Sequence, residues 1–280
     1  MSAAPRPEHP APPPSDFEVT PTAEQVASFR QNGFLRVERV TTDEELAWLA
    51  EIYDKLFSDE RGTFRGGYFD LARPYDVPGQ TVLPQVLYPE RRYPELKATT
   101  YYQNGRRIAA ALLGTTEAQL ESWGHMILKR ARVGPETPWH QDEAYWDPGK
   151  QYHALGMWMP LDHATTESGC LHFIPGSHRR GIEPHRHIDD DPAVHGLRVQ
   201  AGVDTSGGEP QPIPAGGATF HHHRTLHYAG PNTTAIDRRA CATEFQLPVV
   251  DAPEVADRPW VVEGMEAWNK RNLPPRPKKG

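Results

Sequence analysis

The segment PWHQDEAYW at residues 138–146 holds a histidine and an aspartate separated by one residue. If this segment is a β-strand, its side chains alternate between two faces, so His140 and Asp142 point the same way. An imidazole nitrogen and a carboxylate oxygen presented together supply two of the three ligands of a 2-His-1-carboxylate metal site. The chain must then bring a second histidine to this pair.

Four later histidines are candidates for the third ligand: His221, His222, His223 and His227. A jelly roll places a late strand beside an early one, so a histidine remote in sequence can complete the site. Spacing alone does not choose among the four. A run of three histidines is also typical of a solvent-facing segment or of groups that support a metal site from outside, and that reading is favoured for residues 221–223.

Composition and charge exclude several classes of protein. The chain has 280 residues, of which 37% are hydrophobic and 24% charged, as in globular proteins. A formal net charge of −7 gives no attraction to nucleic acid or to an anionic membrane. No apolar run approaches the roughly 18 residues of a membrane span, and we expect no signal peptide. Only Cys170 and Cys241 are present, so we expect a reducing cytoplasm rather than a disulfide framework.

The pattern of elements predicts one domain over residues 16–271, between a disordered Pro-rich N-terminus (1–15) and a flexible tail (272–280). Thr22 and Gln25 form a capping box for a first helix, which Gly33 ends. Thr42 and Glu45 form a second capping box, followed by apolar residues at helical spacing. A third helix is predicted over residues 95–113.

The stretch 62–92 is rich in aromatic residues and in Pro and Gly residues that interrupt regular structure, which predicts an irregular lid or binding loop. Within it we expect Tyr68, Phe69 and Arg73 to face a substrate. The acidic loop that holds His185, His187 and His195 is expected to be solvated rather than to bind a second metal.

Short apolar segments follow in the second half of the chain, punctuated by Gly, Pro and Asp. Strands are predicted at residues 34–37, 125–133, 140–146, 152–161, 170–174, 197–201, 218–222 and 240–249. Helices first and strands second indicate an α+β, mainly β fold, in which N-terminal helices pack on one face of a sandwich or jelly-roll core.

Three ordered blocks resemble the phytanoyl-CoA dioxygenase-like (PhyH) family of Fe(II)/2-oxoglutarate oxygenases. They are HQDEAYW at 140–146, MWMPLDHATTESGCLHFIPGSH at 157–178 and HYAGPNTTAIDRRA at 227–240, and QNGFLRVERV at 31–40 is similar to the family's opening helix and strand. The resemblance covers nearly all of residues 22–250. It implies a double-stranded β-helix core, of the jelly-roll or cupin-like type.

The same resemblance implies roles for individual residues. His140, Asp142 and His227 match the three Fe(II) ligands, and Arg238 matches the arginine that binds the far carboxylate of 2-oxoglutarate. Trp158 matches a tryptophan of the cosubstrate pocket. Lys129 and Thr234 are further candidates for contacts to the cosubstrate. Apart from the resemblance, His and Asp ligands need outer-shell partners that hold their orientation, and Gln141, Trp146 and Asn232 are candidates for this.

Physical chemistry agrees with these implied roles. Three protein ligands on one face of Fe(II) leave three positions open, of which a 2-oxo acid can chelate two and O2 can take the third. Arginine offers a fixed, always charged fork for the far carboxylate. Related halogenases replace the carboxylate ligand by a small residue, so the presence of Asp142 argues against halogenation.

The expected function is oxidation of a small organic substrate in natural-product biosynthesis, with decarboxylation of 2-oxoglutarate to succinate. The outcome is hydroxylation, or ring closure, epimerisation or desaturation from the same substrate radical. The chain departs from the family at Asp162-His163, Ser168 and Gly217-Ala218, so the resemblance does not supply the substrate. Two alternatives stay open: a non-redox cupin-like metal enzyme, and a catalytically silent protein that binds a metal or a 2-oxo acid.

Overall fold

The computed structural model describes residues 10–59, 67–74 and 81–270. The predicted disordered N-terminus and tail lie mostly outside these residues. The described helices are α1 (Ala23–Asn32), α2 (Asp43–Asp59), α3 (Thr100–Leu113) and α4 (Pro259–Lys270). The described strands are β1 (Phe34–Val37), β2 (Tyr68–Asp70), β3 (Pro84–Leu87), β4 (Glu121–Lys129), β5 (Thr137–His140), β6 (Lys150–Gln151), β7 (Ala154–Pro160), β8 (Leu171–Phe173), β9 (His185–His187), β10 (Leu197–Val199), β11 (Glu209–Gln211), β12 (Ala218–His222), β13 (His227–Ala229), β14 (Arg238–Gln246) and β15 (Val250–Asp251).

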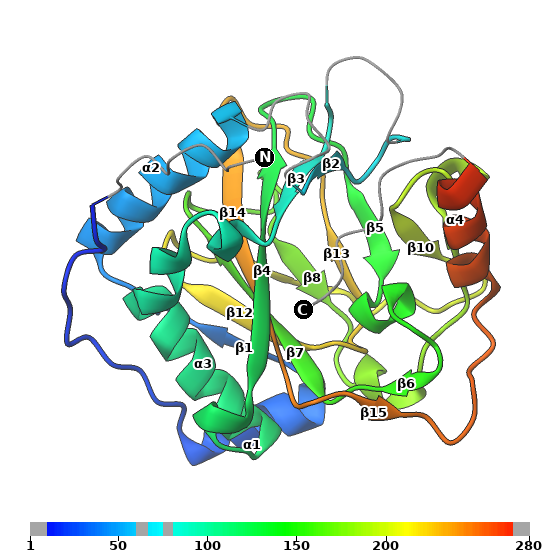
Figure 1. Ribbon diagram of the computed structural model, residues 1–280, viewed down its shortest axis with the longest axis horizontal. Coiled ribbons are helices and arrows are strands. Elements are labelled where there is room, and N and C mark those ends of the chain that lie inside the picture. The colour runs from blue at the N-terminus through cyan, green and yellow to red at the C-terminus, as the bar shows by residue number, and fades with distance from the viewer. Residues whose placement is uncertain (1–9, 60–66, 75–80, 271–280) are drawn as a thin grey trace, which may run out of the picture.

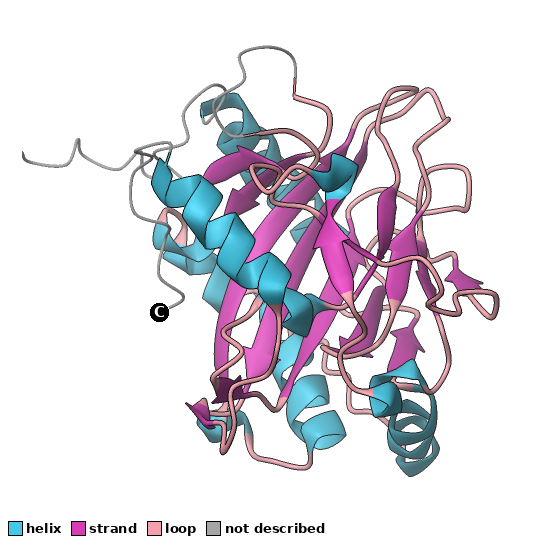
Figure 2. Ribbon diagram, turned by 90° about the vertical axis from the view of Figure 1, so that its right-hand side faces the viewer, coloured by secondary structure: helices cyan, strands magenta, loops and turns pink. Residues whose placement is uncertain are grey.

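Two antiparallel sheets form the centre of the molecule (Figures 1 and 2). The larger has the strand order β1-β12-β7-β14-β4-β3-β2, and the smaller has the order β11-β8-β13-β5. A buried apolar cluster joins them, with Phe34 and Trp158 from the larger sheet and Leu171, Phe173 and Ala229 from the smaller. The described strands thus form the predicted α+β arrangement with a two-sheet core, and the sheets do not close into a barrel.

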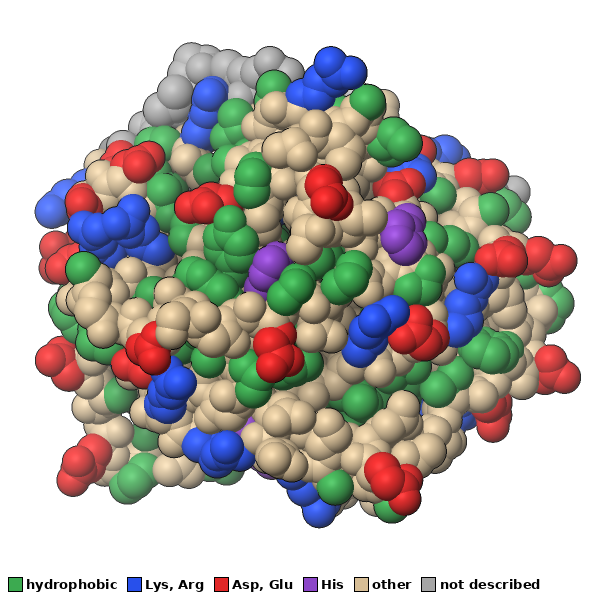
Figure 3. Space-filling model, turned by 180° about the vertical axis from the view of Figure 1, so that it is seen from behind, with side chains coloured by type: hydrophobic (Ala, Val, Ile, Leu, Met, Phe, Trp, Pro, Cys, Tyr) green, Lys and Arg blue, Asp and Glu red, His purple; other side chains and the backbone are tan. Residues whose placement is uncertain are grey.

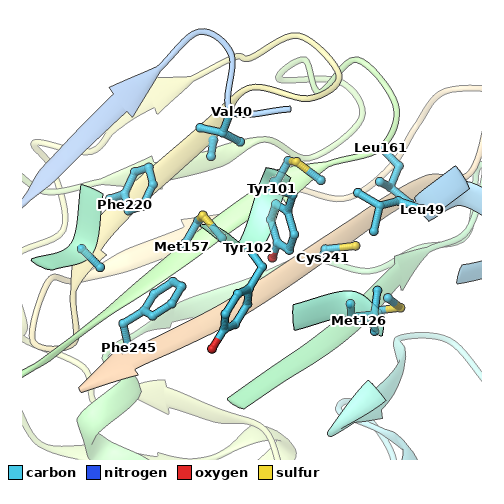
Figure 4. Close-up of a cluster of buried hydrophobic side chains, with 14 of the residues drawn as sticks. Val40, Leu49, Tyr101, Tyr102, Met126, Met157, Leu161, Phe220, Cys241 and Phe245 are labelled. Atoms are coloured by element: carbon cyan, nitrogen blue, oxygen red, sulfur yellow. The ribbon is translucent and has the colours of Figure 1, made fainter. Parts of the chain in front are cut away.

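Helices α1, α2 and α3 lie on the same side of the strands in Figure 1, while α4 lies on the opposite side. The main hydrophobic core fills the space between α2, α3 and the larger sheet. Figure 4 shows Leu49 of α2 near Leu161. It also shows Tyr102 of α3 near Phe245 of β14, with 5.8 Å between the ring centroids. Burial of this outer face is what anchors the sheet, because each large apolar side chain removed from water contributes about 1.5–3 kcal/mol.

Strand alternation divides β12 and β14 between two environments. Phe220 and Phe245 belong to the helix-covered core, whereas His221, Ala242 and Glu244 line a cavity on the other face of the sheet. The inner face of the larger sheet therefore contributes His221 and Glu244 to the cavity.

Local signals predicted α1 well. The capping box of Thr22 and Gln25 is present, and Gly33 ends the helix with φ 83°. The predicted third helix is partly wrong, because Pro94 starts a short 3-10 helix (Pro94–Ala98) and Thr99 caps the α-helix only afterwards.

The stretch 62–92 is more regular than predicted. Its described part contains β2 and β3, which extend the larger sheet: β3 pairs antiparallel to β4, and β2 pairs antiparallel to β3. Helix α4 was not predicted, and it lies beside β9.

No described helix has the length and apolarity that crossing a membrane requires. On the face shown in Figure 3, acidic and basic side chains are intermixed with apolar ones.

The second capping box is only half formed. The Glu45 backbone N–H donates to Thr42 Oγ1 at 3.2 Å, but the Glu45 side chain is turned inward. Its two carboxylate oxygens accept from the backbone N–H groups of Thr100 and Tyr101, at 2.6 and 2.8 Å, and from the hydroxyl of Thr41. A fully buried carboxylate from α2 thus accepts hydrogen bonds from backbone N–H groups in the first turn of α3. Its negative charge also interacts favourably with the positive end of the helix dipole.

We expect E45A to lower the free energy of unfolding by about 2–3 kcal/mol, because two buried N–H groups and one hydroxyl lose their acceptor. Urea denaturation measures this loss. The control is E44A, which removes an exposed carboxylate from the same turn of α2 and should change stability by less than about 0.5 kcal/mol. Equal stabilities of E45A and the unmutated protein would contradict the cap.

Candidate metal centre

Two strands of the smaller sheet bring the predicted ligands together. In the pairing of β5 with β13, His227 lies opposite His140. His140 Nε2 lies 3.9 Å and His227 Nε2 lies 3.5 Å from Asp142 Oδ1. One ligand atom from each residue falls within 4.8 Å of the other two, which suits three ligands around one metal ion.

The predicted strand over 140–146 is wrong after its first residue. β5 ends at His140, and Asp142 begins a 3-10 helix (Asp142–Tyr145). His140 and Asp142 still point to one site, because Gln141 between them is extended, with φ −127° and ψ 136°.

Backbone carbonyls orient both imidazoles. His140 Nδ1 lies 2.7 Å from the carbonyl oxygen of Pro138, and His227 Nδ1 lies 3.0 Å from that of Thr225. A carbonyl only accepts, so each Nδ1 carries the hydrogen and donates it. Each Nε2 is left with its lone pair directed at the cluster, which is the tautomer a metal ligand needs.

Burial and charge hold the three groups in their metal-binding protonation states. Burial lowers the pKa of His140, and it lowers the pKa of His227 well below its usual value. Burial alone would raise the pKa of Asp142, but the hydrogen bond from His221 stabilises the ionised carboxylate, and that pKa is below its usual value. Neutral imidazoles beside an ionised carboxylate bind a cation without first having to release protons.

His221 is a member of the site that the sequence did not single out. It is buried on β12, and its Nε2 lies 3.0 Å from Asp142 Oδ2. The signal in the sequence was the run of three histidines. The run does not show which member faces inward, since that depends on how β12 is registered against its neighbours.

A cavity of about 290 Å³ extends from the cluster between the two sheets. Of the predicted cosubstrate and substrate residues, Arg238, Trp158 and Phe69 line it. Among the described residues, its wall also includes side chains that the sequence reading did not place there: Gln85, Leu87, Tyr88, Trp123, His125, Ile127, Tyr145, Met157, His195, Glu244 and Trp268.

Arg238 is a buried cation that faces this cavity. It is 2% exposed, and its Nε and Nη1 have no hydrogen-bond partner in the described structure. Burial lowers the pKa of Arg238 to about 10, so the guanidinium stays charged at neutral pH. The ring of Trp158 lies 5.1 Å from its Cζ and fixes its plane. Two unsatisfied charged donors in a cavity fit the carboxylate of a bound anion.

Lys129 and Thr234 have other partners. The Lys129 ammonium donates to the carbonyls of Ala229, at 2.9 Å, and Gly230, so it ties β4 to the end of β13. Thr234 Oγ1 donates to Asn232 Oδ1 at 2.7 Å and so shapes the turn after β13. Neither residue lies in the cavity wall, so their prediction as cosubstrate contacts is not supported by their position.

The three predicted substrate residues separate because of strand alternation. Phe69 faces the cavity, where its ring meets His195 at 5.2 Å. Tyr68, the neighbouring residue of β2, turns into the helix-covered core and reaches Thr81 Oγ1 at 3.1 Å. Arg73 follows β2 and lies outside the cavity wall.

The acidic loop is less solvated than predicted. His195 lies in the cavity wall, and His185 and His187 are buried. The described residues of this loop form no second cluster of metal ligands.

Glu143, next to Asp142, is the centre of a buried ionic network. Its carboxylate is 1% exposed and lies 2.8 Å from His223 Nε2, 2.6 Å from Arg224 Nε and 2.8 Å from Arg258 Nη2. Arg258 also donates to the carbonyl oxygen of Glu143 at 2.6 Å, and Trp260 Nε1 donates to that of Ala144 at 2.9 Å. The segment that leads into α4 therefore holds the short helix on which Asp142 sits.

These observations define a two-sheet jelly-roll protein whose cavity holds a His-Asp-His centre and an arginine with two donors that have no partner among the described residues. The chain belongs to the phytanoyl-CoA dioxygenase (PhyH) family, which matches residues 29–240. It is similar to the solved structure of EvdO2 from Micromonospora carbonacea var. aurantiaca complexed with 2-oxoglutarate. The two are 40% identical, the match covers 87% of this chain and 99% of that one, and the TM-score is 0.75.

A second solved structure, SnoK, is described as a non-heme alpha-ketoglutarate-dependent carbocyclase from nogalamycin biosynthesis. It is 22% identical, with 94% of this chain and 97% of that one covered and a TM-score of 0.66, and so shares the fold. A curated relative is the probable alpha-ketoglutarate-dependent hypophosphite dioxygenase of Stutzerimonas stutzeri, 33% identical over 109 residues, or 38% of each chain. The chain spans 38%, 61% and 50% of the length of three curated relatives. These comparisons confirm the predicted family and fold.

We expect R258M to lower the free energy of unfolding by about 3 kcal/mol or more, because it leaves a buried carboxylate short of a charge partner. Urea denaturation measures the loss. In an E143Q background the same substitution should cost much less, since the buried charge is then gone. An equal cost in both backgrounds would contradict the network.

His185 predicts a dependence of stability on pH. Its Nδ1 donates to the Glu183 carbonyl oxygen at 2.7 Å, and its Nε2 accepts from the Gln141 backbone N–H at 3.2 Å, so the folded protein needs the neutral ring. Burial lowers the pKa of His185 from 6.5 to about 4. In the unfolded chain the ring takes up its proton first, so this stability is complete above pH 6.5 and is lost as the pH falls toward 4.

The loss should reach roughly 2–3 kcal/mol, at about 1.4 kcal/mol for each pKa unit. Urea denaturation between pH 7 and pH 4.5 measures it. H185Q keeps a donor and an acceptor but does not titrate, so its stability should fall less steeply. Parallel curves for both proteins would show that His185 is not the responsible group.

Proposed function

We propose that this protein is an Fe(II)- and 2-oxoglutarate-dependent oxygenase that oxidises a small organic substrate in natural-product biosynthesis and converts 2-oxoglutarate to succinate and CO2. The observation that carries this proposal is the arrangement of one cavity. It holds a buried His140–Asp142–His227 cluster in metal-binding protonation states. The same wall holds the guanidinium of Arg238, whose Nε and Nη1 have no partner in the part of the chain that the structure describes. A non-redox metal enzyme has no need of such an anion site.

Three residues are proposed to hold the metal. His140 and His227 offer Nε2, because their Nδ1 hydrogens are engaged by backbone carbonyls. Asp142 offers Oδ1, the oxygen nearest to both rings. When bound, Fe(II) would couple decarboxylation of a 2-oxo acid to oxidation of an unactivated carbon by O2.

Arg238 is proposed to bind the far carboxylate of 2-oxoglutarate. Alternation along β14 explains why Arg238, and not Arg239, faces the cavity. Arg239 points to the outer face, where it lies 2.9 Å from Asp162 and 3.1 Å from Asp54. Trp158 would hold the guanidinium plane against the cosubstrate.

The rest of the cavity is proposed to bind the primary substrate. Aromatic side chains make up much of this wall, with a few polar ones among them: Phe69, Tyr88, Trp123, Tyr145, Trp268, Gln85, His125 and Glu244. Apolar walls with a few polar groups are typical of small-molecule sites. EvdO2 in its complex with 2-oxoglutarate supports the cosubstrate, and the SnoK carbocyclase supports a substrate from natural-product biosynthesis.

The proposed oxidation is hydroxylation, or ring closure, epimerisation or desaturation from the same substrate radical. We further propose a single oxygenase domain and a cytoplasmic location. The buried free thiols of Cys170 and Cys241 support the latter, since they suit a reducing compartment.

The test is anaerobic addition of Fe(II) and 2-oxoglutarate to metal-free protein, followed in the visible spectrum. Chelation of the 2-oxo acid should give a weak charge-transfer band. Metal binding without a band would favour a non-redox metal enzyme, and no metal binding would favour a silent binding protein. A band without succinate formation in air would also contradict the proposal.

We expect R238M to weaken 2-oxoglutarate binding about 10- to 100-fold, because at least one charge-assisted hydrogen bond worth about 1.5–3 kcal/mol is lost. Titration of the charge-transfer band measures the affinity. The adjacent arginine supplies a matched control, since R239M removes a cation from the outer face and should leave the affinity unchanged. Equal affinities of R238M and R239M would refute the role of Arg238.

A further inference from the structure

We infer that His221 is a positioning residue that makes Asp142 a one-oxygen ligand. Its Nε2–H donates to Asp142 Oδ2 and leaves Oδ1 for the metal. This inference rests on the proposed function of the His140–Asp142–His227 cluster, and it gives the inward-facing member of the histidine run a role.

The two oxygens of Asp142 have different surroundings. Oδ1 lies 3.5 Å and 3.9 Å from the ligand nitrogens of His227 and His140, whereas Oδ2 lies 3.0 Å from His221 Nε2. An ionised carboxylate only accepts, so Nε2 of His221 must carry the hydrogen. That hydrogen removes the Nε2 lone pair with which His221 would otherwise compete as a ligand.

The His221 ring is held from both sides. In the larger sheet His221 lies opposite Gly156 of β7, where a Cβ would sit 2.9 Å from the ring atoms Cε1 and Nε2. On the other side the ring of Phe173 lies 5.3 Å away between centroids. His221 is 6% exposed. The ring therefore fits this place only because position 156 has no side chain, and the packing leaves it little freedom to turn from Asp142.

The other two histidines of the run have different partners. His223 faces the same way as His221 and pairs with Glu143, the neighbour of Asp142. The ring of His222 stacks on that of His223, with 4.2 Å between centroids, and lies 5.3 Å from that of His178. The end of β12 thus contacts two successive carboxylates of the short helix, and His221 is the contact to the proposed ligand.

The chemical consequence concerns the open positions on the metal. A carboxylate with both oxygens free can chelate and take up two positions, while a 2-oxo acid needs two and O2 needs one. A hydrogen bond that occupies Oδ2 keeps Asp142 to a single position. Outer-shell partners of this kind typically contribute about 10- to 100-fold to metal affinity.

The experiment compares H221F, which cannot donate, with H221Q, whose amide can place a donor near the position of Nε2. H222F is the matched control at the neighbouring residue of β12, whose ring packs on His223 and His178. G156A is an independent variant that displaces the His221 ring without changing it. Thermal unfolding of the metal-free proteins shows that each variant folds. The readouts are Fe(II) affinity from anaerobic titration and the position of the charge-transfer band with 2-oxoglutarate.

We expect H221F and G156A to lose about 10- to 100-fold in Fe(II) affinity and to shift the band. H221Q should recover most of the affinity, and H222F should match the unmutated protein. Unchanged metal affinity and band in H221F would overturn the inference. Equal losses of Fe(II) affinity in H221F and H221Q would also overturn it, because they would indicate an effect of ring packing. An equal loss in H222F would overturn it as well, because it would indicate a disturbed strand. Failure of the unmutated protein to bind Fe(II) would instead refute the proposed function.

Discussion

The antiparallel pairing of β5 with β13 is the constraint on which the site depends. It sets His140 opposite His227 although the two are far apart in the chain, and the backbone carbonyls of these segments fix both tautomers. The pairing persists because β13 is also paired with β8 and is tied to β4 through Lys129. A one-residue slip would turn His227 away from Asp142.

Two buried charged residues near this pairing, Glu143 and Arg238, differ in whether their charge has a partner. Glu143 is surrounded by His223, Arg224 and Arg258, so its charge is compensated and the network serves the structure. Arg238 is as deeply buried, yet two of its donors have no partner in the described structure. A protein tolerates an unsatisfied buried cation when a ligand completes it, because the desolvation cost is then recovered on binding. Glu143 is therefore part of the structural framework, whereas Arg238 is a group that a ligand can bind.

Elements whose ends are set by local interactions were predicted correctly from the sequence. The capping box of Thr22 and Gln25 and the left-handed Gly33 are contacts within a few residues, and α1 begins and ends where they predicted. The prediction was wrong where a distant partner intervened. Glu45 caps α3 rather than its own helix. Residues 84–87 form a strand because β4 offers an edge to pair with, and residues 68–70 then pair with that strand.

The sequence by itself determined the metal-binding chemistry, the family and the mainly-β fold, because the types and order of residues in the three blocks are enough to indicate them. Only the tertiary structure decided which neighbours act. It placed His221 rather than His222 against Asp142. It placed Arg238 rather than Arg239 in the cavity wall. In the same way, Phe69 rather than Tyr68 lines the cavity. Each of these choices is between adjacent residues of one strand. Adjacent residues face opposite sides, and which side is the inside depends on sheet pairing and on the helices that cover the other face.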